Sequence, residues 1–288
     1  MKTQTKIKNG YNYLNELCSF NADFNASTPS VNPITNRVQY IIHQLEALNI
    51  THELDMYNSK NAFIDEIKAE DTKYINVMVR FNSTLNPTSD TIVFLAHHDV
   101  VNLNSENCQD NTASVSNLLH LCSLLKLKQE NNTLESNVVV CFTDAEESVS
   151  FDSKYGRSGS VRLGHRITKG DLGKVKYAIN LELTAMGKNL WICPYIPKEQ
   201  ENIVTKDILN IDSNVKTYRV PPNDSIALVL QGIQGVCIGT LDDENSKQAN
   251  EKGFCSTWML CHREADKFEN AIESDMTNLV DNLLIRLV

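Results

Sequence analysis

The chain has 288 residues and a formal net charge of −9, with 41% hydrophobic and 22% charged residues. This length can bury a large core, and the composition is that of an ordinary globular protein. The acidic balance argues against nucleic acid or an anionic membrane as the main partner. The sequence also contains no Lys/Arg block with interleaved aromatic residues.

The N-terminal stretch MKTQTKIKNGYNYLNELC contains no continuous apolar segment. It therefore predicts neither a signal peptide nor a transmembrane helix, and we expect a cytoplasmic protein with no membrane partner. None of the eight cysteines forms a CxxC pair, and several lie in apolar runs, so we expect reduced, mostly buried thiols. The sequence does not indicate an oligomeric state.

In chain order, the hydrophobic pattern predicts two helices at 3–19 and 34–49, joined by a polar loop from Asn21 to Pro33. Strand-like runs follow at 50–57, 74–81, 91–96, 137–143, 176–183, 189–193, 215–220 and 235–240. Helix-like runs alternate with them at 112–128, 199–211, 224–232 and 264–287. We expect loops at 148–165 and 242–256, on which substrate preference would depend.

Strands that alternate with helices predict a sheet covered by helices on both faces. The runs TIVFLA and VVVCF are almost entirely apolar, which is typical of strands buried on both faces. We expect an α/β protein with three layers, α/β/α, around a central mixed, mostly parallel sheet of about eight strands. Because no repeat or low-complexity linker interrupts the pattern, we expect residues 1–288 to form a single domain.

Side chains that bind metal ions follow several of these predicted strands. Ligands of such sheets bind beyond the carboxyl ends of the strands, and imidazole and carboxylate groups suit zinc. The candidate metal ligands are His97, Asp110, Glu147, Glu182 and His262. Their order and spacing together indicate a hydrolase with two metal ions.

The first candidate ends a predicted strand in the tripeptide His97-His98-Asp99. Alternate residues of an extended chain point to the same side, so Asp99 is placed to hold the His97 ring and fix its tautomer. His98 then faces away and is structural. The alternative is an ordinary pair of histidines at a strand end.

The other single ligands have alternative roles as well. Asp110 precedes a predicted helix, where an Asp followed by Asn and Thr is a common N-cap; in the metal interpretation its carboxylate bridges two ions. Glu182 lies in the strand segment INLEL, where an edge-facing carboxylate is the alternative. His262 lies before the last predicted helix, and a lone histidine there is often structural.

Glu146 and Glu147 follow the most hydrophobic predicted strand. Adjacent carboxylates repel each other, and a cation would relieve that repulsion. We expect one, Glu147, to bind metal. The other, Glu146, would take a proton from the attacking water and pass it to the leaving amine. A solvated acidic turn is the alternative.

Taken together, the pattern resembles metallopeptidase family 28, the co-catalytic zinc aminopeptidases related to aminopeptidase Y. The resemblance extends from about Ile92 to the C-terminus. It includes Asn223-Asp224-Ser225 followed by Gly-Ile-Gln-Gly-Val, and Asp266 four residues after His262. It implies the fold of zinc-dependent exopeptidases, with a peptide or dipeptide as the substrate of an aminopeptidase or dipeptidase.

The resemblance also implies roles for individual residues. Two ligand sets share one carboxylate: His97, Asp110 and Glu182, and Asp110, Glu147 and His262. Glu146 is then the general acid/base and Asp99 the residue that orients a ligand. Two divalent ions are implied, zinc first, although cobalt or manganese also suits these ligands.

This sequence departs from the family pattern at several positions. The family usually has Asp where this chain has Glu182, a Tyr where it has Cys261 and a Pro where it has Gln234. The segment from Ser148 to Gly159 is longer than usual and is a candidate lid.

Three alternatives compete with the exopeptidase. A neighbouring peptidase family inserts a dimerisation domain before its last histidine, but only 80 residues separate Glu182 from His262. Glutaminyl cyclases, which are acyltransferases, use one zinc on residues matching Asp110, Glu147 and His262. A catalytically inactive, metal-free relative retained for binding is the third.

Overall fold

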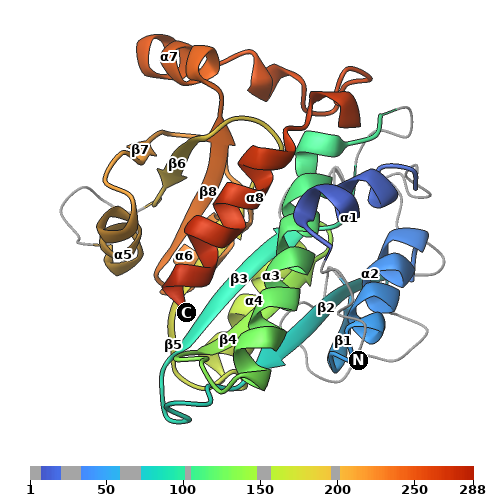
Figure 1. Ribbon diagram of the computed structural model, residues 1–288, viewed down its shortest axis with the longest axis vertical. Coiled ribbons are helices and arrows are strands. Elements are labelled where there is room, and N and C mark those ends of the chain that lie inside the picture. The colour runs from blue at the N-terminus through green and yellow to red at the C-terminus, as the bar shows by residue number, and fades with distance from the viewer. Residues whose placement is uncertain (1–7, 21–33, 59–72, 101–104, 148–156, 196–201) are drawn as a thin grey trace, which may run out of the picture.

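The computed structural model describes residues 8–20, 34–58, 73–100, 105–147, 157–195 and 202–288. These residues contain one eight-stranded sheet in the order β1-β2-β4-β3-β5-β8-β6-β7 (Figure 1). The strands are β1 (His52–Tyr57), β2 (Tyr74–Phe81), β3 (Thr91–His97), β4 (Asn137–Thr143), β5 (Val175–Leu181), β6 (Asn189–Cys193), β7 (Lys216–Thr217) and β8 (Gly235–Leu241). The α-helices are α1 (Gly10–Leu17), α2 (Asn36–Ala47), α3 (Ala113–Glu130), α4 (Ser158–Thr168), α5 (Ile203–Ile211), α6 (Asp224–Val229), α7 (Asp243–Lys252) and α8 (Glu273–Asn282).

The centre of the sheet is parallel and its margins are mostly antiparallel. β3 pairs in parallel with both β4 and β5, and β5 pairs in parallel with β8. β1, β2 and β6 are attached by antiparallel pairings, and β7 adds a short parallel pairing to β6. The expected mixed, mostly parallel sheet of about eight strands is therefore confirmed.

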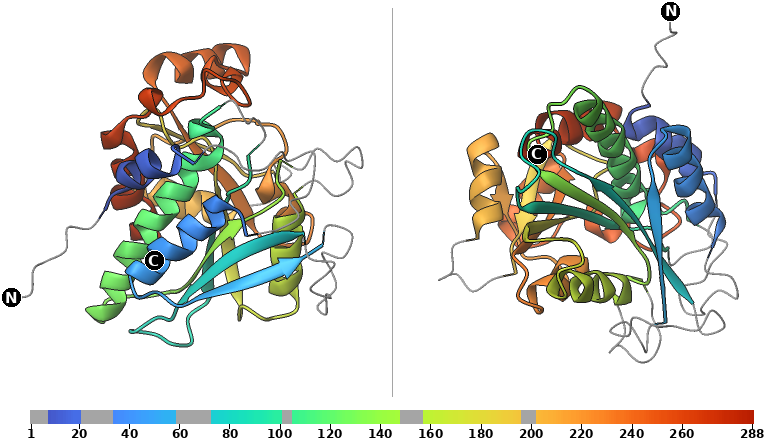
Figure 2. Two further views of the ribbon diagram at one scale, coloured as in Figure 1. Left: turned by 90° about the vertical axis from the view of Figure 1, so that its right-hand side faces the viewer. Right: turned by 90° about the horizontal axis from the view of Figure 1, so that it is seen from below.

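Two apolar cores lie on opposite faces of the sheet, because side chains alternate along each strand. In β3, Ile92, Phe94 and Ala96 belong to the core that includes residues of α2, α3, α5 and α8. Val93 and Leu95 belong to the core that includes residues of α4 and α6. Figure 2 shows these helices on the two faces, as expected for three layers. All residues of β3 are buried, as its apolar run predicted.

The expected helix over 264–287 is wrong as a continuous element. A 3-10 turn at Phe268–Asn270 is followed by extended backbone at Ala271 and Ile272, and α8 begins only at Glu273. The Ile272 backbone N–H donates to the Ala185 carbonyl at 2.9 Å. This tertiary hydrogen bond accompanies the extended backbone, so the apolar residues of the predicted helix are divided between two segments.

Two helices lie where loops were expected. In α4, Gly159 and Gly164 weaken the helical signal in the sequence. In α7 only Asn245 and Ala249 are buried, so the sequence of this helix shows no apolar stripe.

Two predicted elements are shorter in the structure. The predicted strand 215–220 is reduced to Lys216–Thr217, and the predicted helix 224–232 ends at Val229. Several predicted segments lie outside the described residues: the loop 21–33, residues 3–7 of the first predicted helix, residues 199–201 of another, and most of the candidate lid, 148–156.

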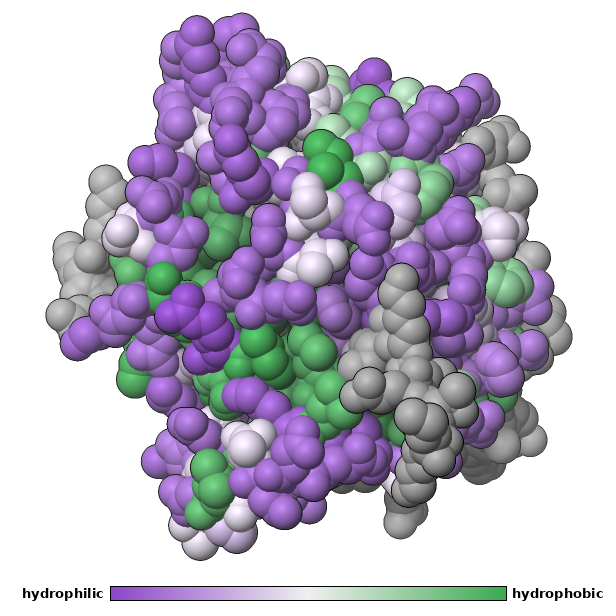
Figure 3. Space-filling view, in the orientation of Figure 1, coloured by the Kyte–Doolittle hydropathy of each residue, from purple (hydrophilic) through white to green (hydrophobic). Residues whose placement is uncertain are grey.

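Figure 3 shows that the face carrying α8 is mostly hydrophilic, with some apolar side chains exposed on it. All eight cysteines lie within the described residues; each is a free thiol, and every one except Cys261 is buried. The helices of the described ranges are each too short or too polar to cross a lipid bilayer.

Candidate metal centre

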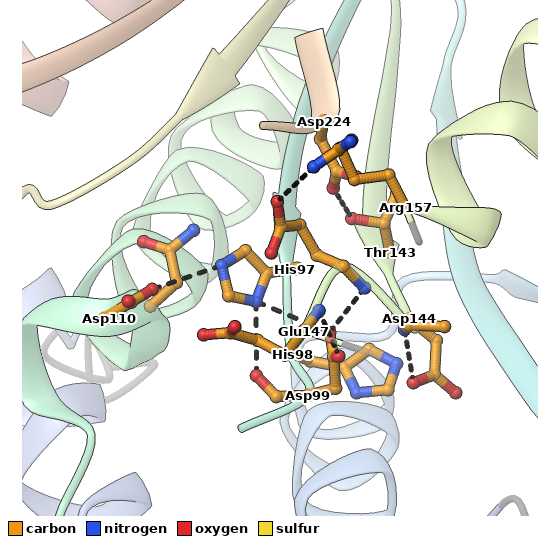
Figure 4. Close-up of polar contacts among 12 residues, drawn as sticks. His97, His98, Asp99, Asp110, Thr143, Asp144, Glu147, Arg157 and Asp224 are labelled. Carbon is orange, nitrogen blue, oxygen red and sulfur yellow. Dashed lines mark hydrogen bonds and ion pairs between the residues drawn. The ribbon is translucent and has the colours of Figure 1, made fainter. Parts of the chain in front are cut away.

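The candidate site lies where parallel strands of the sheet end. His97 is the last residue of β3 and is the Cα partner of Thr143, the last residue of β4. Glu146 and Glu147 follow β4, and Glu182 directly follows β5. The neighbouring parallel strands therefore bring these side chains to the carboxyl ends of the strands, as predicted. Figure 4 shows His97 and Glu147 in this region together with Asp110.

His97 is held between carboxylates on both sides of its ring. It is 1% exposed; its Nε2 lies 3.4 Å from Asp110 Oδ1 and 3.5 Å from Glu182 Oε2. Its Nδ1 lies 3.4 Å from Asp99 Oδ1, which is the contact expected for an orienting residue. His98 faces elsewhere, with Nε2 2.9 Å from the Ile75 carbonyl, and burial lowers its pKa to about 4.

The Asp110 carboxylate lies between the two candidate histidines. Its Oδ1 faces His97, and its Oδ2 lies 3.2 Å from Nε2 of His262. The residue belongs to a short helical segment, η3 (Cys108–Thr112), that precedes α3. The residue at the N-cap of α3 is Thr112 and not Asp110, and the Asp110 carboxylate contacts the two histidines instead.

His262 comes from a turn and not from the start of a helix, because α8 begins at Glu273. The turn follows the 3-10 segment η5 (Thr257–Met259), and His262 has the left-handed backbone value φ 62°. Its Nε2 lies 2.8 Å from Oε1 of Glu147. The side chain of His262 is 48% exposed and that of Glu147 only 7%, so this part of the site opens to solvent.

Asp99 has a second role that the sequence did not reveal. Its carboxylate accepts the backbone N–H groups of Glu146 at 3.2 Å and of Glu147 at 2.9 Å. One side chain thus joins the end of β3 to the double-glutamate turn after β4 and also contacts the ring of His97. These contacts fix the direction in which both glutamates leave the turn.

The donor atoms fit divalent metal ions. Within the described part of the chain, three groups of side chains have ligand atoms within 4.8 Å of one another: His97, Asp110 and Glu182; Asp110, Glu147 and His262; His97, Glu146 and Glu147. Around a four-coordinate zinc with bonds of about 2.0–2.1 Å, neighbouring ligand atoms are about 3.3 Å apart. The distances of 3.4 and 3.5 Å from His97 Nε2 to Asp110 and Glu182 match that separation.

The electrostatics of the cluster also favour cations. Burial raises the pKa of Glu146 well above its usual value, and burial with the nearby Asp110 raises that of Glu147 to about 7. Hydrogen bonds to Asp110 and Glu147 raise the pKa of His262 to about 10. Burial opposes charge on His97, yet the surrounding carboxylates raise its pKa well above the usual value. The glutamates and histidines of the cluster thus favour their protonated forms, and divalent ions would compete with protons for the same positions.

Further residues hold the ligand-bearing segments in place. Asn180 Nδ2 donates to Oε1 of Glu182 at 3.0 Å, which leaves Oε2 toward His97. The carboxylate of buried Asp266 accepts the backbone N–H groups of Gln109 at 2.7 Å and Asp110 at 3.1 Å. Asp266 was noted in the sequence only as part of a motif, and its anchoring contact needed the structure to be seen.

The N-terminal helix α2 reaches the same segments through Arg37. This arginine is 5% exposed and donates from Nε to the His98 carbonyl at 2.9 Å and from Nη2 to Thr112 Oγ1 at 2.9 Å. Burial lowers its pKa to about 10. No pattern in the sequence distinguished Arg37 from other helix residues.

Two more polar residues border the double-glutamate turn. Asp224, at the start of α6, is fully buried and accepts a hydrogen bond from Thr143 Oγ1 at 2.5 Å. Arg157 lies with Nη1 3.9 Å from Oε1 of Glu146, and Figure 4 includes both contacts. The sequence singled out Asp224 as part of a loop motif, whereas it gave no signal for Arg157.

Comparison with known proteins identifies relatives of this arrangement. A sequence model described as peptidase family M28 matches residues 76–288. A search of curated proteins finds no match. Among solved structures, glutaminyl cyclase from Porphyromonas gingivalis has 16% identity and a TM-score of 0.72, over 96% of this chain and 95% of its own. The LapA aminopeptidase of Legionella pneumophila has 15% identity and a TM-score of 0.67, over 97% and 70%.

A zinc aminopeptidase from Bacillus subtilis, BSAP, is also similar, with 16% identity and a TM-score of 0.58. The match covers 74% of this chain and 48% of that protein, so this chain spans about half the length of BSAP. At such identities the structural similarity shows the fold alone. The family match covers well over half of the sequence and includes all the candidate ligands. The chain belongs to peptidase family M28.

Proposed function

We propose that this protein is a zinc-dependent exopeptidase that hydrolyses a terminal peptide bond, as an aminopeptidase or a dipeptidase. The observation that carries the proposal is the position of Asp110, whose two oxygens face two different histidines, His97 and His262. A carboxylate placed in this way is suited to bridge two cations. The proposal treats residues 1–288 as one metallopeptidase domain.

Two ions would be held by overlapping ligand sets. One set is His97, Asp110 and Glu182, and the other is Asp110, Glu147 and His262. Zinc fits the donor chemistry, and cobalt or manganese is the alternative for the same nitrogen and oxygen ligands. When bound, such ions polarise a carbonyl group and lower the pKa of water toward neutrality.

Glu146 would act as the general acid/base. Its side chain is 13% exposed and shares the turn after β4 with the ligand Glu147, so it is close to the ligands without being one in either set. It takes a proton from the attacking water and delivers it to the nitrogen of the leaving amine. Burial raises its pKa, which favours a carboxyl that can hold this proton between the two steps.

Asp99 would act on the reaction through its neighbours. It holds the ring of His97 by contact with Nδ1 and holds the backbone of the double-glutamate turn by two hydrogen bonds. The acidic side chains that remain around the ligands attract the free ammonium group of a peptide. This attraction would select substrates by their N-terminus and so favour exopeptidase action.

A second candidate function is that of a glutaminyl cyclase, which would use only Asp110, Glu147 and His262 for one zinc. The observation that favours it is the agreement in length: the structural match extends over 96% of this chain and 95% of the Porphyromonas gingivalis cyclase. The ligand distances around His97 favour the two-ion exopeptidase instead.

One assay separates the two activities. Protein loaded with zinc is incubated with peptides that begin with glutamine or with other residues, and free amino acids and ammonia are measured separately. The exopeptidase releases an amino acid from several peptides. Release of ammonia from glutamine peptides alone, with no free amino acid, would overturn the exopeptidase proposal in favour of the cyclase.

A further inference from the structure

Arg157 places a guanidinium at the edge of an acidic site. Its Nη1 lies 3.9 Å from Oε1 of Glu146, and the same Nη1 donates to the Pro222 carbonyl at 3.2 Å. Its side chain is 31% exposed, against 13% for Glu146, so the arginine lies nearer to solvent than the glutamate. A substrate entering the site would meet Arg157 beside the acid/base group.

The guanidinium has capacity for a further partner. It has five N–H donors in a planar fork that matches a carboxylate, and the contact with Glu146 is at the long end for an ion pair. Arg157 precedes α4 and has the left-handed value φ 63°, while its hydrogen bond to Pro222 ties it to the loop before α6. Two segments of the fold therefore fix where its charge lies.

We propose that Arg157 binds the free carboxylate of the residue on the leaving side of the scissile bond, so that dipeptides are the preferred substrates. This inference rests on the proposed function, in which Glu146 gives a proton to the leaving nitrogen. In a dipeptide the terminal carboxylate carbon is two bonds from that nitrogen. A cation next to the Glu146 carboxylate is thus within reach of it.

The charges around the site explain why an arginine is needed for this contact. In the proposed site, Glu147 and Glu182 bind the ions, which leaves Glu146 and the fully buried Asp224 as acidic groups without an ion. A substrate carboxylate that approaches these two acidic groups is favoured where a guanidinium faces it. In a longer peptide the same position holds a neutral amide, which gains much less from a guanidinium.

A different role predicts different kinetics. If Arg157 only positions Glu146, its loss slows the hydrolysis of every substrate by the same factor, mainly by lowering kcat. If it binds the substrate carboxylate, its loss raises the KM for dipeptides and leaves the KM for their C-terminal amides nearly unchanged. Dipeptides and their amides therefore form a matched pair of substrates.

The experiment compares zinc-loaded wild-type protein with Arg157→Met and Arg157→Lys, using alanyl-alanine, leucyl-alanine and their C-terminal amides. We expect Arg157→Met to lower kcat/KM for the free acids by about tenfold to a hundredfold and for the amides by no more than about threefold. Arg157→Lys should recover part of the loss. Arg286→Met removes an exposed arginine near the C-terminus and is the control for charge.

Equal losses on acids and amides, or no loss on either, would overturn the proposal. Binding provides a readout that does not depend on turnover: calorimetry of zinc-loaded Glu146→Gln with the same acids and amides, with and without Arg157→Met. A preference for the acids that disappears with Arg157→Met supports the inference even if wild-type protein hydrolyses nothing, in which case the proposed function alone fails. Equal affinity of Glu146→Gln for acids and amides overturns the inference.

Discussion

The two candidate metal centres share Asp110 but are built from different kinds of structure. The inner centre uses His97 and Glu182, at the ends of central strands, and His97 is 1% exposed. The outer centre uses Glu147 and His262, and His262 is 48% exposed in a turn outside the sheet. The ligands of the inner centre are thus fixed by the packed strands of the core, whereas the position of one ligand of the outer centre depends on the conformation of a surface turn.

This difference bears on both activity and specificity. The outer ligand set is the one that a single-zinc cyclase would use, so occupation of the inner set is what distinguishes the two-ion exopeptidase. Ligands fixed by packed strands lose little conformational freedom when an ion binds, whereas the half-exposed side chain of His262 loses more. We therefore expect the inner centre to hold its ion more firmly.

The largest effect should come from the residue that both centres share. Asp110→Ala removes one ligand from each set, so we expect the protein to lose both zinc ions. Metal analysis after dialysis against buffer without chelator measures this loss. The control is Asp243→Ala, which changes an aspartate whose side chain is 74% exposed. Full metal content in Asp110→Ala would remove the basis for treating the two centres as a pair.

The next effect separates chemistry from metal binding. Glu146→Gln keeps the shape of the side chain but cannot accept the proton, so zinc content should stay at the wild-type value. Turnover should fall by about a hundredfold to ten-thousandfold. Steady-state kinetics and metal analysis of the same preparation check both parts, with exposed Glu264→Gln as the control. A variant that retains wild-type turnover would show that the base is another group.

Single-centre variants sharpen the comparison directly. We expect His262→Ala to retain one ion, in the inner centre, and His97→Ala to retain one ion in the outer centre with weaker affinity. Titration of each variant with a competing chelator measures how tightly it holds its remaining ion, and so ranks the affinities of the two centres. If the ion of His97→Ala is the more firmly held, the burial argument for the inner centre is wrong.

The smallest effect concerns the residue that supports the ligands. An amide at Asp99 would turn one N–H donor toward a backbone N–H, because the carboxylate now accepts from both Glu146 and Glu147. We expect Asp99→Asn to weaken zinc binding by about tenfold to a hundredfold, as loss of such supporting contacts does elsewhere. Calorimetric titration with zinc measures the change. Unchanged zinc affinity in that titration would show that Asp99 does not support the ligands.

The sequence predicted well those parts of the fold whose signal is local. The run TIVFLA predicted β3, since a strand buried on both faces needs apolar side chains on both. Because His97 and Glu182 lie at strand ends, their convergence followed from the parallel order of the sheet. The helix α7 gave no such signal, because its outer position leaves nearly all of its side chains in water.

Contacts between distant segments were not predictable in the same way. Arg37 meets the His98 carbonyl across 61 residues, and Arg157 meets the Pro222 carbonyl across 65. An arginine in a helix or beside a loop resembles any solvated arginine until the fold brings its partner to it. The helix predicted from residue 264 onward, directly after His262, likewise begins only at Glu273, because the apolar residues before it lie partly in extended backbone.

The most direct test of the account is a crystal structure of the zinc-loaded protein with anomalous diffraction data at the zinc edge. We predict two anomalous peaks on either side of Asp110, one bound also by His97 and Glu182 and the other by Glu147 and His262. A single peak confined to Asp110, Glu147 and His262, or none at these residues, would contradict the two-ion site.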